Sequence, residues 1–435
     1  MSKKEFFQYR RYYSKFERGK LSEDPSINLI EPKESFSKVL NHLVDQKYLY
    51  FTKDGYFHLL PKGLFIHETL ISQAAGLMEK EGVLKYRFSS FYSTNKKDSI
   101  WTLISKFEKQ VYKVFGNREQ YLKYASDPVL FEYFKGREII TPLKIYSPDY
   151  FFRVIQTGEL HPLIQPREFF MTDFHFFCEK SDFESYIQAS LFNKKAVELF
   201  TGDWYLNVDT NKDFFESHQD FFIEMFDRLA VNAVVNVTSK KTHYYSIQSQ
   251  FMVDYYFGNR TQLANLQFDE MNGEIFHITS STSKKPVTII HGTFFGRIEK
   301  VMALIFGKQM EGSEKPILPA TLCPITVRVF PISNNPNISK FVGNLEYKLH
   351  SVHCRYDIDS RDISLRKKII EAEHDWIPFQ VVVGEEEEQT KNLSVRDRRS
   401  GTNGNFSIEK FVELVASKDI RSQPVSTRFE GNGIY

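Results

Sequence analysis

The chain has 435 residues, a length typical of two or three domains. Apolar residues make up 41% of it, which suffices for hydrophobic cores and excludes global disorder. Its 57 Lys and Arg nearly balance 55 Asp and Glu, so the net charge of +2 gives no global sign of nucleic-acid binding. Three cysteines exclude a disulfide framework and favour a reducing, cytoplasmic setting. No apolar run is long enough to predict a membrane span.

In chain order, residues 1–30 are polar and predict a weakly structured arm. The following part alternates helical spacing with runs of aromatic and β-branched residues. Helices are predicted at 35–47, 64–81, 99–115, 182–199, 213–229 and from 293 to about 308. From about residue 139 the aromatic runs between these helices predict the strands of an antiparallel sheet.

Residues 309–318 form a polar link that contains Gly and Pro. Beyond it, strands and helices alternate, which predicts a small α/β domain around a five-stranded sheet. The sequence therefore predicts an α+β protein. An arm (1–30) precedes an antiparallel sheet with flanking helices (31–315) and a C-terminal α/β domain (316–435).

The most specific pattern is DIDSRDISLRKKIIEAEHDWIPFQVVVGEEEEQTKNLSVRDRRSG at 357–401. It resembles the anticodon-binding domain of archaeal-type threonyl-tRNA synthetases, which are class II aminoacyl-tRNA synthetases. The resemblance implies tRNA binding, with Asp362, Glu387 and Arg396 facing the anticodon. A carboxylate can accept a base amino group, and Arg can read or stack on a base. Four further cations are candidates for phosphate contacts: Lys367, Lys368, Arg398 and Arg399. The alternative is that these charges belong to solvated loops and strand ends.

Residues 31–315 resemble the catalytic domain of the same family in three blocks. LLPKGLFIHETLIS (59–72) matches the first motif, a helix after Pro-Lys-Gly that builds the dimer interface, so a homodimer is implied. TPLKIYSPDYFFRVIQTGELHPLIQPREFFMTDFHFFC (141–178) matches the second motif and its loop. ANLQFDE (264–270) and VTIIHGTFFGRIEKVMALI (287–305) match the region around the third motif.

The resemblance implies a Zn²⁺ ion in the amino-acid pocket, held by one Cys and two His, that binds the amino group and hydroxyl of threonine. His175 and His291 match the histidines, and Asp127 stands at the cysteine position. Asp is an accepted zinc ligand, although an oxygen donor makes the site less zinc-selective than a thiolate would. Asp173 matches the residue that receives the threonine hydroxyl. Without the resemblance, two strand histidines and a surface aspartate would be the simpler interpretation.

The same resemblance implies an ATP site that works with Mg²⁺. Arg153 matches the Arg that holds the α-phosphate and the carboxylate. Lys300 stands where the family has an Arg that packs on adenine and holds the γ-phosphate, and Lys lacks the planar fork of Arg. Arg167 and Gln267 match residues that bind substrate. A shift of the alignment by a few residues would place Arg297 in the third motif.

Two further positions depart from the family pattern on the ATP side. Ile155 replaces a Glu that reads the adenine amino group, and Gln165 replaces an Arg. Three hypotheses follow. The chain is a synthetase that charges threonine-specific tRNA, a catalytically impaired paralogue that binds tRNA, or an accessory subunit of another nucleic-acid machine.

Overall fold

The structure is a computed structural model, and the residues it describes are 13–17, 20–23, 36–52, 56–93, 99–117, 119–156, 159–160, 163–231, 233–239, 243–256, 259–417 and 426–429. Within the predicted arm it describes two short strands, β1 (Tyr13–Glu17) and β2 (Lys20–Glu23). The rest of the arm lies outside the described residues.

The chain divides into two compact units. The first unit contains residues 70–305, 53–56 and the described part of 1–35, and the second contains 36–52, 57–69 and 306 onward. The predicted division near residue 315 followed chain order, whereas these units combine segments that are distant in sequence. None of the helices among the described residues has both the length and the hydrophobicity to cross a bilayer.

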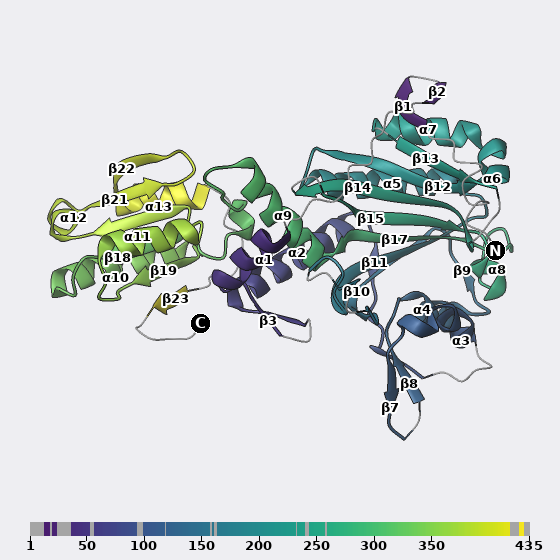
Figure 1. Cartoon of the computed structure of the whole chain (residues 1–435), viewed down its shortest axis with the longest axis horizontal. Helices are drawn as coiled ribbons and strands as arrows, with labels where there is room; N and C mark the ends of the chain where they lie inside the picture. Colours follow the sequence, from purple (N-terminus) through teal and green to yellow (C-terminus); the bar gives the residue numbers. More distant parts are fainter. Residues whose placement is uncertain are drawn as a thin grey trace. The chain divides into compact units, whose positions relative to one another are not determined.

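The first unit is built on an eight-stranded sheet in the order β13–β12–β14–β15–β17–β11–β10–β5 (Figure 1). Parallel pairs occur only at its two edges, β12–β13 and β10–β5, so the predicted antiparallel sheet is confirmed. The strands are β5 (Leu84–Lys85), β10 (Leu143–Phe152), β11 (Glu168–Cys178), β12 (Trp204–Asn211), β13 (Ala233–Thr238), β14 (Tyr245–Tyr256), β15 (Asn259–Asp269) and β17 (Thr288–Arg297).

The two faces of this sheet differ because side chains alternate along each strand. Phe174 on β11 and Phe294 on β17 share the face that α5 (Phe183–Glu198) covers. Phe192 of α5 stacks on Phe294 with 4.4 Å between ring centroids. Gly292 lies on the same face, where a Cβ would overlap the Phe174 ring. The residues between these positions therefore face the other side, where the candidate site lies.

Two helices differ from the prediction, one in length and one in position. In the range 99–115, only Ser99–Ile104 is α-helical (α3), followed by a 3₁₀ segment with non-helical backbone angles at Phe107 and by the strand β7 (Lys113–Phe115). The helix predicted from Thr293 begins at Ile298 (α9, Ile298–Gly312). The five residues before it belong to β17, where a bulge with positive φ at Phe295 and Gly296 interrupts the pairing before Arg297.

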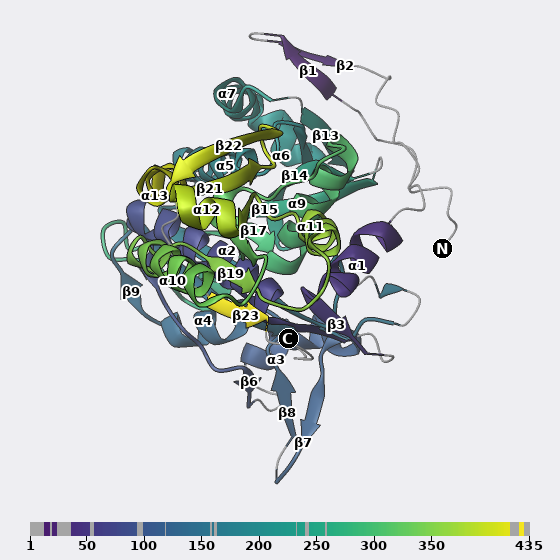
Figure 2. The same cartoon turned by 90° about the vertical axis from the view of Figure 1, so that its left-hand side faces the viewer.

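The remaining elements of the first unit surround the large sheet. Figures 1 and 2 both show the tip of β7 and β8 extending beyond α3 and α4, away from this sheet. These elements are β6 (Phe91–Tyr92), β8 (Glu119–Leu122), α4 (Asp127–Phe134), β9 (Glu138–Ile139), α6 (Lys212–Ser217), α7 (Gln219–Leu229), α8 (Asn272–Ile275) and β16 (Thr279–Ser280).

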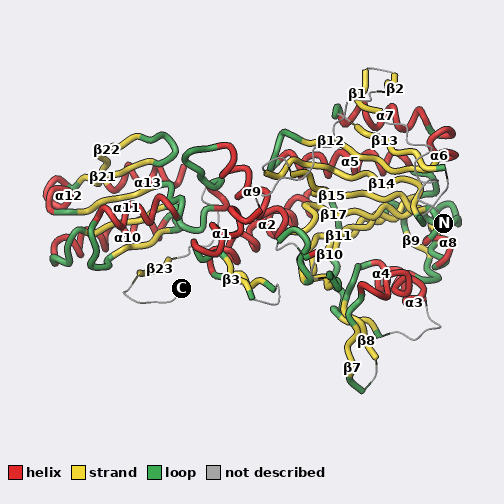
Figure 3. Tube along the Cα trace, viewed as in Figure 1, coloured by secondary structure: helices red, strands yellow, loops and turns green. Residues whose placement is uncertain are grey.

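The second unit contains a helix-covered sheet in the order β22–β21–β20–β18–β19–β23. The predicted α/β domain is confirmed, but among the described residues its sheet has six strands rather than five, because β23 adds to the edge. Figure 3 distinguishes its strands from its helices. The strands are β18 (Val327–Pro331), β19 (Tyr356–Asp359), β20 (Phe379–Val383), β21 (Asn392–Asp397), β22 (Thr402–Ser407) and β23 (Ser426–Phe429). The helices are α10 (Pro336–Ser351), α11 (Leu365–His374), α12 (Glu385–Thr390) and α13 (Ile408–Ser417).

An N-terminal segment completes the second unit: α1 (Phe36–Asp45), β3 (Leu49–Phe51), β4 (Phe57–Leu59) and the first turns of α2 (Pro61–Lys80). His42 stacks on Trp376 at 4.3 Å between ring centroids, and the Lys62 ammonium lies 2.7 Å from the Asp375 carboxylate. Gly63 is required at the start of α2, since a Cβ there would lie 2.1 Å from the Tyr48 carbonyl oxygen. Ring stacking and a partly buried ion pair therefore fix this segment within the unit.

Candidate functional site

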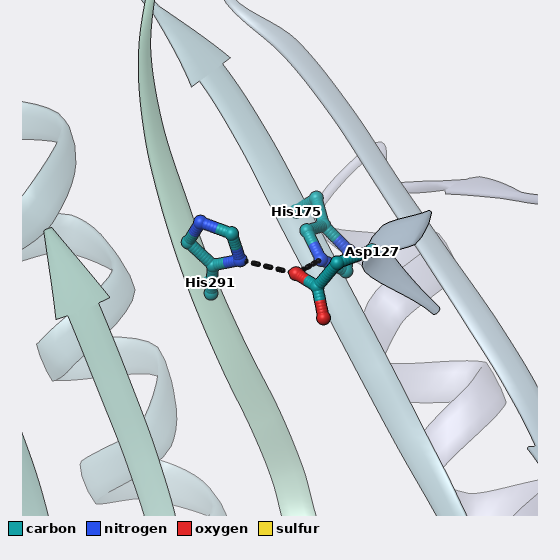
Figure 4. Close-up of side chains that lie close together, drawn as sticks. All are labelled: Asp127, His175 and His291. Atoms are coloured by element: carbon teal, nitrogen blue, oxygen red, sulfur yellow. Dashed lines mark hydrogen bonds and ion pairs between the residues drawn. The ribbon is translucent and has the colours of Figure 1, made fainter. Parts of the chain in front are cut away.

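Three side chains that are far apart in sequence converge on the open face of the large sheet (Figure 4). Asp127 Oδ1 lies 3.0 Å from His175 Nε2 and 2.6 Å from His291 Nδ1. Figure 4 shows the Asp127 carboxylate between the two imidazoles, which come from neighbouring strands. The structure thus brings together the three residues that the sequence analysis proposed as metal ligands.

Strand register and a helix start position these three groups. His175 on β11 pairs directly with His291 on β17, so both rings point from the same face. Asp127 is the first residue of α4, whose Phe131 packs edge-on against both imidazoles, with centroid distances of 6.1 Å and 5.6 Å. The preceding Ser126 shares a 2.8 Å hydrogen bond with another buried serine of the sheet. The site is therefore built on regular elements with packed support.

A fourth residue, Asp269, orients one imidazole. Its fully buried carboxylate lies 2.8 Å from His291 Nε2 and accepts hydrogen bonds from the backbone N–H groups of Met271 and Asn272. A carboxylate at Nε2 favours a proton there and leaves Nδ1 as the ligand atom that faces Asp127. The sequence analysis missed Asp269, although strand alternation puts it on the same face as Gln267, two residues earlier.

The electrostatics of this cluster follow from its opposite charges. Burial alone would raise the pKa of Asp127, but the charge of His291 and hydrogen bonds from both imidazoles hold the pKa well below its usual value. Burial opposes protonation of His291, yet Asp127 and Asp269 outweigh it and raise the pKa of the imidazole to about 10. Without a cation from outside, a proton on His291 balances the carboxylates.

The donor set fits a divalent metal ion. The three ligand atoms all lie within 4.8 Å of one another. Bonds of about 2.0–2.2 Å at tetrahedral angles place ligand atoms roughly 3.4 Å apart, so one ion would hold all three after small movements of these side chains. Three protein ligands leave a coordination position for substrate, and Asp269 supplies the outer carboxylate that commonly orients a ligating imidazole.

Asp127, His175 and His291 line a cavity of 540 Å³ in the first unit. Asp173, Gln267 and Arg153, each predicted to bind substrate or to act in catalysis, line the same cavity. Burial raises the pKa of the Asp173 carboxyl to about 6. The Gln267 side-chain oxygen accepts a 2.6 Å hydrogen bond from Tyr244.

Besides Lys106, three cations line this cavity: Arg153, Arg297 and Lys300. Each donates to a backbone carbonyl oxygen, and over the described residues none of them forms an ion pair with a carboxylate. The guanidinium groups of Arg153 and Arg297 lie 5.3 Å and 4.2 Å from the centroid of the Phe169 ring. The cavity therefore holds cations that form no direct ion pair with a carboxylate of the described residues.

Burial and the repulsion between neighbouring positive charges lower the pKa values of two of these cations. Burial, with the nearby charge of Arg153, lowers the pKa of Arg297 to about 9. Burial, with the nearby charge of Arg297, lowers the pKa of Lys300 to about 7. An anionic ligand would relieve both effects, because it would supply the missing countercharge.

Arg297 was not among the predicted site residues. It enters the cavity because the positive φ of Gly296 turns the end of β17, where a Cβ would lie 1.8 Å from the Leu263 carbonyl oxygen. The Gly-Arg pair just before a helix is the signal in the sequence. Arg167, predicted to bind substrate, does not line the cavity, and its Nε donates to the Ile155 carbonyl oxygen at 3.2 Å.

The residues proposed to face the anticodon lie at two edges of the second sheet. Asp362 follows β19 and Glu387 lies in α12 after β20, so both are at the carboxyl edge of the parallel strands. Arg396 pairs with Gln380 near the start of β20 and lies 3.3 Å from Glu373, toward the opposite edge. The structure therefore does not bring the three together.

Local structure also differs from the prediction around these residues. The sequence pattern is typical of a hairpin-like turn flanked by Glu387 and Arg396 and of a helix that begins at Asp362. In the structure Glu387 lies within the helix α12, and Asp362 precedes α11 by three residues. Glu387 caps α12, since its carboxylate accepts from the Gly384 N–H at 2.7 Å and from the Ser394 hydroxyl at 2.6 Å. Among the candidate phosphate contacts, Lys368 and Arg398 are buried and bonded within the domain, whereas Lys367 and Arg399 are exposed.

Comparison with known proteins supports this architecture. Residues 326–418 match the anticodon binding domain family. The threonine–tRNA ligase of Pyrococcus furiosus is 29% identical over 387 residues, which cover 84% of this chain and 60% of that protein. The chain thus spans about 60% of the length of the relatives it matches.

Two solved structures from Cryptosporidium parvum share the fold. The RNA binding domain of its threonyl-tRNA synthetase gives a TM-score of 0.75 at 17% identity, covering 88% of this chain and 99% of that one. Its prolyl-tRNA synthetase gives 0.67 at 17% identity, covering 88% of this chain and 78% of that one. These findings confirm the predicted resemblance: the chain is a relative of the archaeal threonine–tRNA ligases and contains an anticodon binding domain at residues 326–418.

Proposed function

We propose that this chain activates threonine with ATP and attaches it to tRNA. The observation that carries the proposal is one 540 Å³ cavity that contains both the Asp127, His175 and His291 cluster and cations without protein counterions. The first set suits an amino acid with a hydroxyl group, and the second suits a nucleotide. Both substrates of the activation step would then share one site.

On the amino-acid side, Asp127, His175 and His291 would hold Zn²⁺. The ion would supply Lewis-acid coordination of the substrate amino and hydroxyl groups. Asp173, on the same strand face as His175, would accept a hydrogen bond from the hydroxyl. Such a site discriminates strongly against valine, since the methyl group of valine leaves buried polar groups unpaired.

On the nucleotide side, ATP would enter with Mg²⁺ and place its phosphates among Arg153, Arg297 and Lys300. A carboxylate oxygen of threonine then attacks the α-phosphorus, and pyrophosphate leaves. Side chains do little covalent chemistry in this step. The rate enhancement comes from positioning the reactants and from stabilising the charge that develops. Guanidinium groups without a carboxylate partner can provide this stabilisation.

Pyrophosphate exchange tests this proposal. Purified chain is incubated with ATP, Mg²⁺, threonine and labelled pyrophosphate, and label in ATP is measured. We expect threonine-dependent exchange that Arg153→Ala lowers by about two orders of magnitude or more, as loss of a preorganised charged donor does. Exchange no higher than in Arg153→Ala would reject the enzymatic proposal.

A catalytically impaired paralogue that binds tRNA or acts as an accessory protein is the second candidate. Ile155, whose buried side chain does not line the cavity, and Gln165, which does line it, favour this candidate. Ile155 has no hydrogen-bond acceptor in place of the Glu of the family pattern, and Gln165 has no positive charge in place of the Arg. Under this proposal threonine still raises the melting temperature, but no exchange is detected. Charging of tRNA above background would exclude it.

We also propose that the chain forms a homodimer in the cytoplasm. The resemblance of α2 to the first synthetase motif supports the dimer, and three unpaired, buried cysteines suit a reducing compartment. Light scattering on the purified chain should give twice the 51.2 kDa chain mass. A mass of one chain at micromolar concentration would count against the dimer.

A further inference from the structure

A second cavity, of 570 Å³, lies entirely within the second unit. Its walls come from two segments, 309–319 and 398–401. Its charged lining consists of Lys315, Arg398 and Arg399, and none of its lining residues carries a carboxylate. The cavity is therefore positive and separate from the threonine and ATP site proposed above.

Arg398 builds the cavity. Its side chain is 6% exposed and donates to Glu373 Oε2 at 2.8 Å and to the Pro316 carbonyl oxygen. Its backbone N–H donates to the Pro378 carbonyl oxygen at 2.8 Å. These hydrogen bonds connect the turn after β21 with the segment at 316–318. Arg398 is thus a structural residue whose charge Glu373 balances.

The other two cations of the cavity, Lys315 and Arg399, lie beside the turn that follows β21. The turn is closed by Asp397, whose backbone oxygen accepts from the Gly401 N–H at 2.9 Å, and Gly401 has φ of +70°. The Lys315 ammonium lies 4.0 Å from the point where a Cβ of Gly401 would be. The Arg399 guanidinium donates a long hydrogen bond, 3.5 Å to the Leu318 carbonyl oxygen, and interacts with the Cys323 thiol. Within the described part of the chain, neither cation pairs with a carboxylate.

We propose that Lys315 and Arg399 bind a backbone phosphate of the RNA that the anticodon binding domain holds. This inference rests on the proposed tRNA binding. Two unpaired cations beside a positive-φ glycine give a phosphate both charge and close approach to the backbone, without any base edge being read. The turn also begins at the edge of the sheet toward which Arg396 lies. The proposed phosphate site therefore lies at the edge near Arg396, opposite the edge that carries Asp362 and Glu387.

Salt dependence of RNA binding by the full chain tests the inference. The probe is a hairpin RNA with an anticodon stem and loop, and Kd is measured from roughly 50 to 200 mM salt. The Lys315→Gln plus Arg399→Gln variant should reduce the slope of log K against log salt by about 0.7–0.9, which is the contribution of one phosphate contact. The loss of affinity should be the same for hairpins with altered anticodon bases, because a phosphate contact does not read sequence.

Two matched variants accompany this test. Lys340→Gln removes an exposed cation from α10 and should leave the slope unchanged. Lys315→Arg plus Arg399→Lys keeps both charges and should restore most of the wild-type slope. Equal melting temperatures for all variants would exclude misfolding as the cause.

The outcomes separate this inference from the proposed function. If wild type binds the hairpin and the double Gln variant shows the wild-type slope, the phosphate site is rejected while tRNA binding stands. A loss that depends on the anticodon bases would also reject it, since base reading would then be responsible. If wild type binds no hairpin RNA at these salt concentrations, both proposals are wrong.

Discussion

Two clusters of charged side chains, one in each unit, are built in opposite ways. In the second unit, the Arg328 guanidinium is 2% exposed and lies 2.7 Å from Asp357 and 2.9 Å from Asp375, and Lys62 completes the cluster. In the first unit, the cavity cations Arg297 and Lys300 are paired only with backbone carbonyl oxygens. Charges paired within the protein stabilise the fold, whereas charges left without a protein partner mark where a charged ligand is expected.

The largest expected effect sharpens this contrast. Arg328→Met leaves Asp357 and Asp375 buried without their shared partner and should lower the free energy of unfolding by roughly 3–5 kcal/mol. Arg297→Met removes an unpaired cation and should leave the free energy of unfolding unchanged or higher, while weakening ATP binding. Urea denaturation of both variants measures the difference, and equal losses would contradict the comparison.

Metal binding should stabilise the first unit to a smaller extent. Zn²⁺ at about 100 times its Kd should add about 2.7 kcal/mol to the free energy of unfolding, and a chelator should remove the gain. Paired His175→Ala and His291→Ala substitutions should abolish it. Asp269→Asn keeps the three ligands but loses the orienting carboxylate, so metal affinity should fall about 10–100-fold. Stabilisation by Zn²⁺ in the double His variant would show that the ion binds elsewhere.

Lys300 predicts a pH effect of defined sign. Its pKa is lowered to about 7 in the folded chain, below the ordinary lysine value of 10.5, so the unfolded chain holds more protons between these values. The free energy of unfolding should therefore rise with pH across this window, and Lys300→Met should flatten the rise. ATP binding near pH 8 should take up a proton, because phosphates favour the charged ammonium. Calorimetry in two buffers of different ionisation enthalpy measures this uptake, and none in wild type would contradict the assignment.

The smallest effect concerns Glu387. Because its carboxylate caps α12, Glu387→Ala should cost about 1 kcal/mol of stability even without RNA. A matched cap variant, Ser394→Ala, loses one of the same hydrogen bonds but no charge. If Glu387 also reads a base, only Glu387→Ala should change the preference among hairpins with different anticodon bases. Equal preferences in the two variants would leave Glu387 a structural residue.

Local sequence signals predicted the parts of the fold that depend on short-range order. Strand alternation placed His175 and Asp173 on one face, and the strand–helix rhythm after residue 318 predicted the α/β domain. Asp127 came from the family resemblance, since no local pattern links the start of α4 to strands about 50 and 160 residues later.

The missed features depend on tertiary register. Asp269 meets His291 only because β15 and β17 pair in one register, and Arg297 reaches the cavity only through the positive φ of Gly296. The grouping of α1 with the C-terminal part depends on contacts such as the His42–Trp376 stack, which span most of the chain. Such contacts leave no periodic signal, so the sequence analysis assigned domains by chain order.

Calorimetric titration of threonine into the Zn²⁺-loaded chain tests the central claim most directly. We predict saturable binding of threonine that exceeds the binding of valine by several orders of magnitude, as expected for a site that pairs with a hydroxyl group. His291→Ala should lose this binding. Equal affinities for threonine and valine, or unchanged threonine binding in His291→Ala, would contradict the assignment of this cavity.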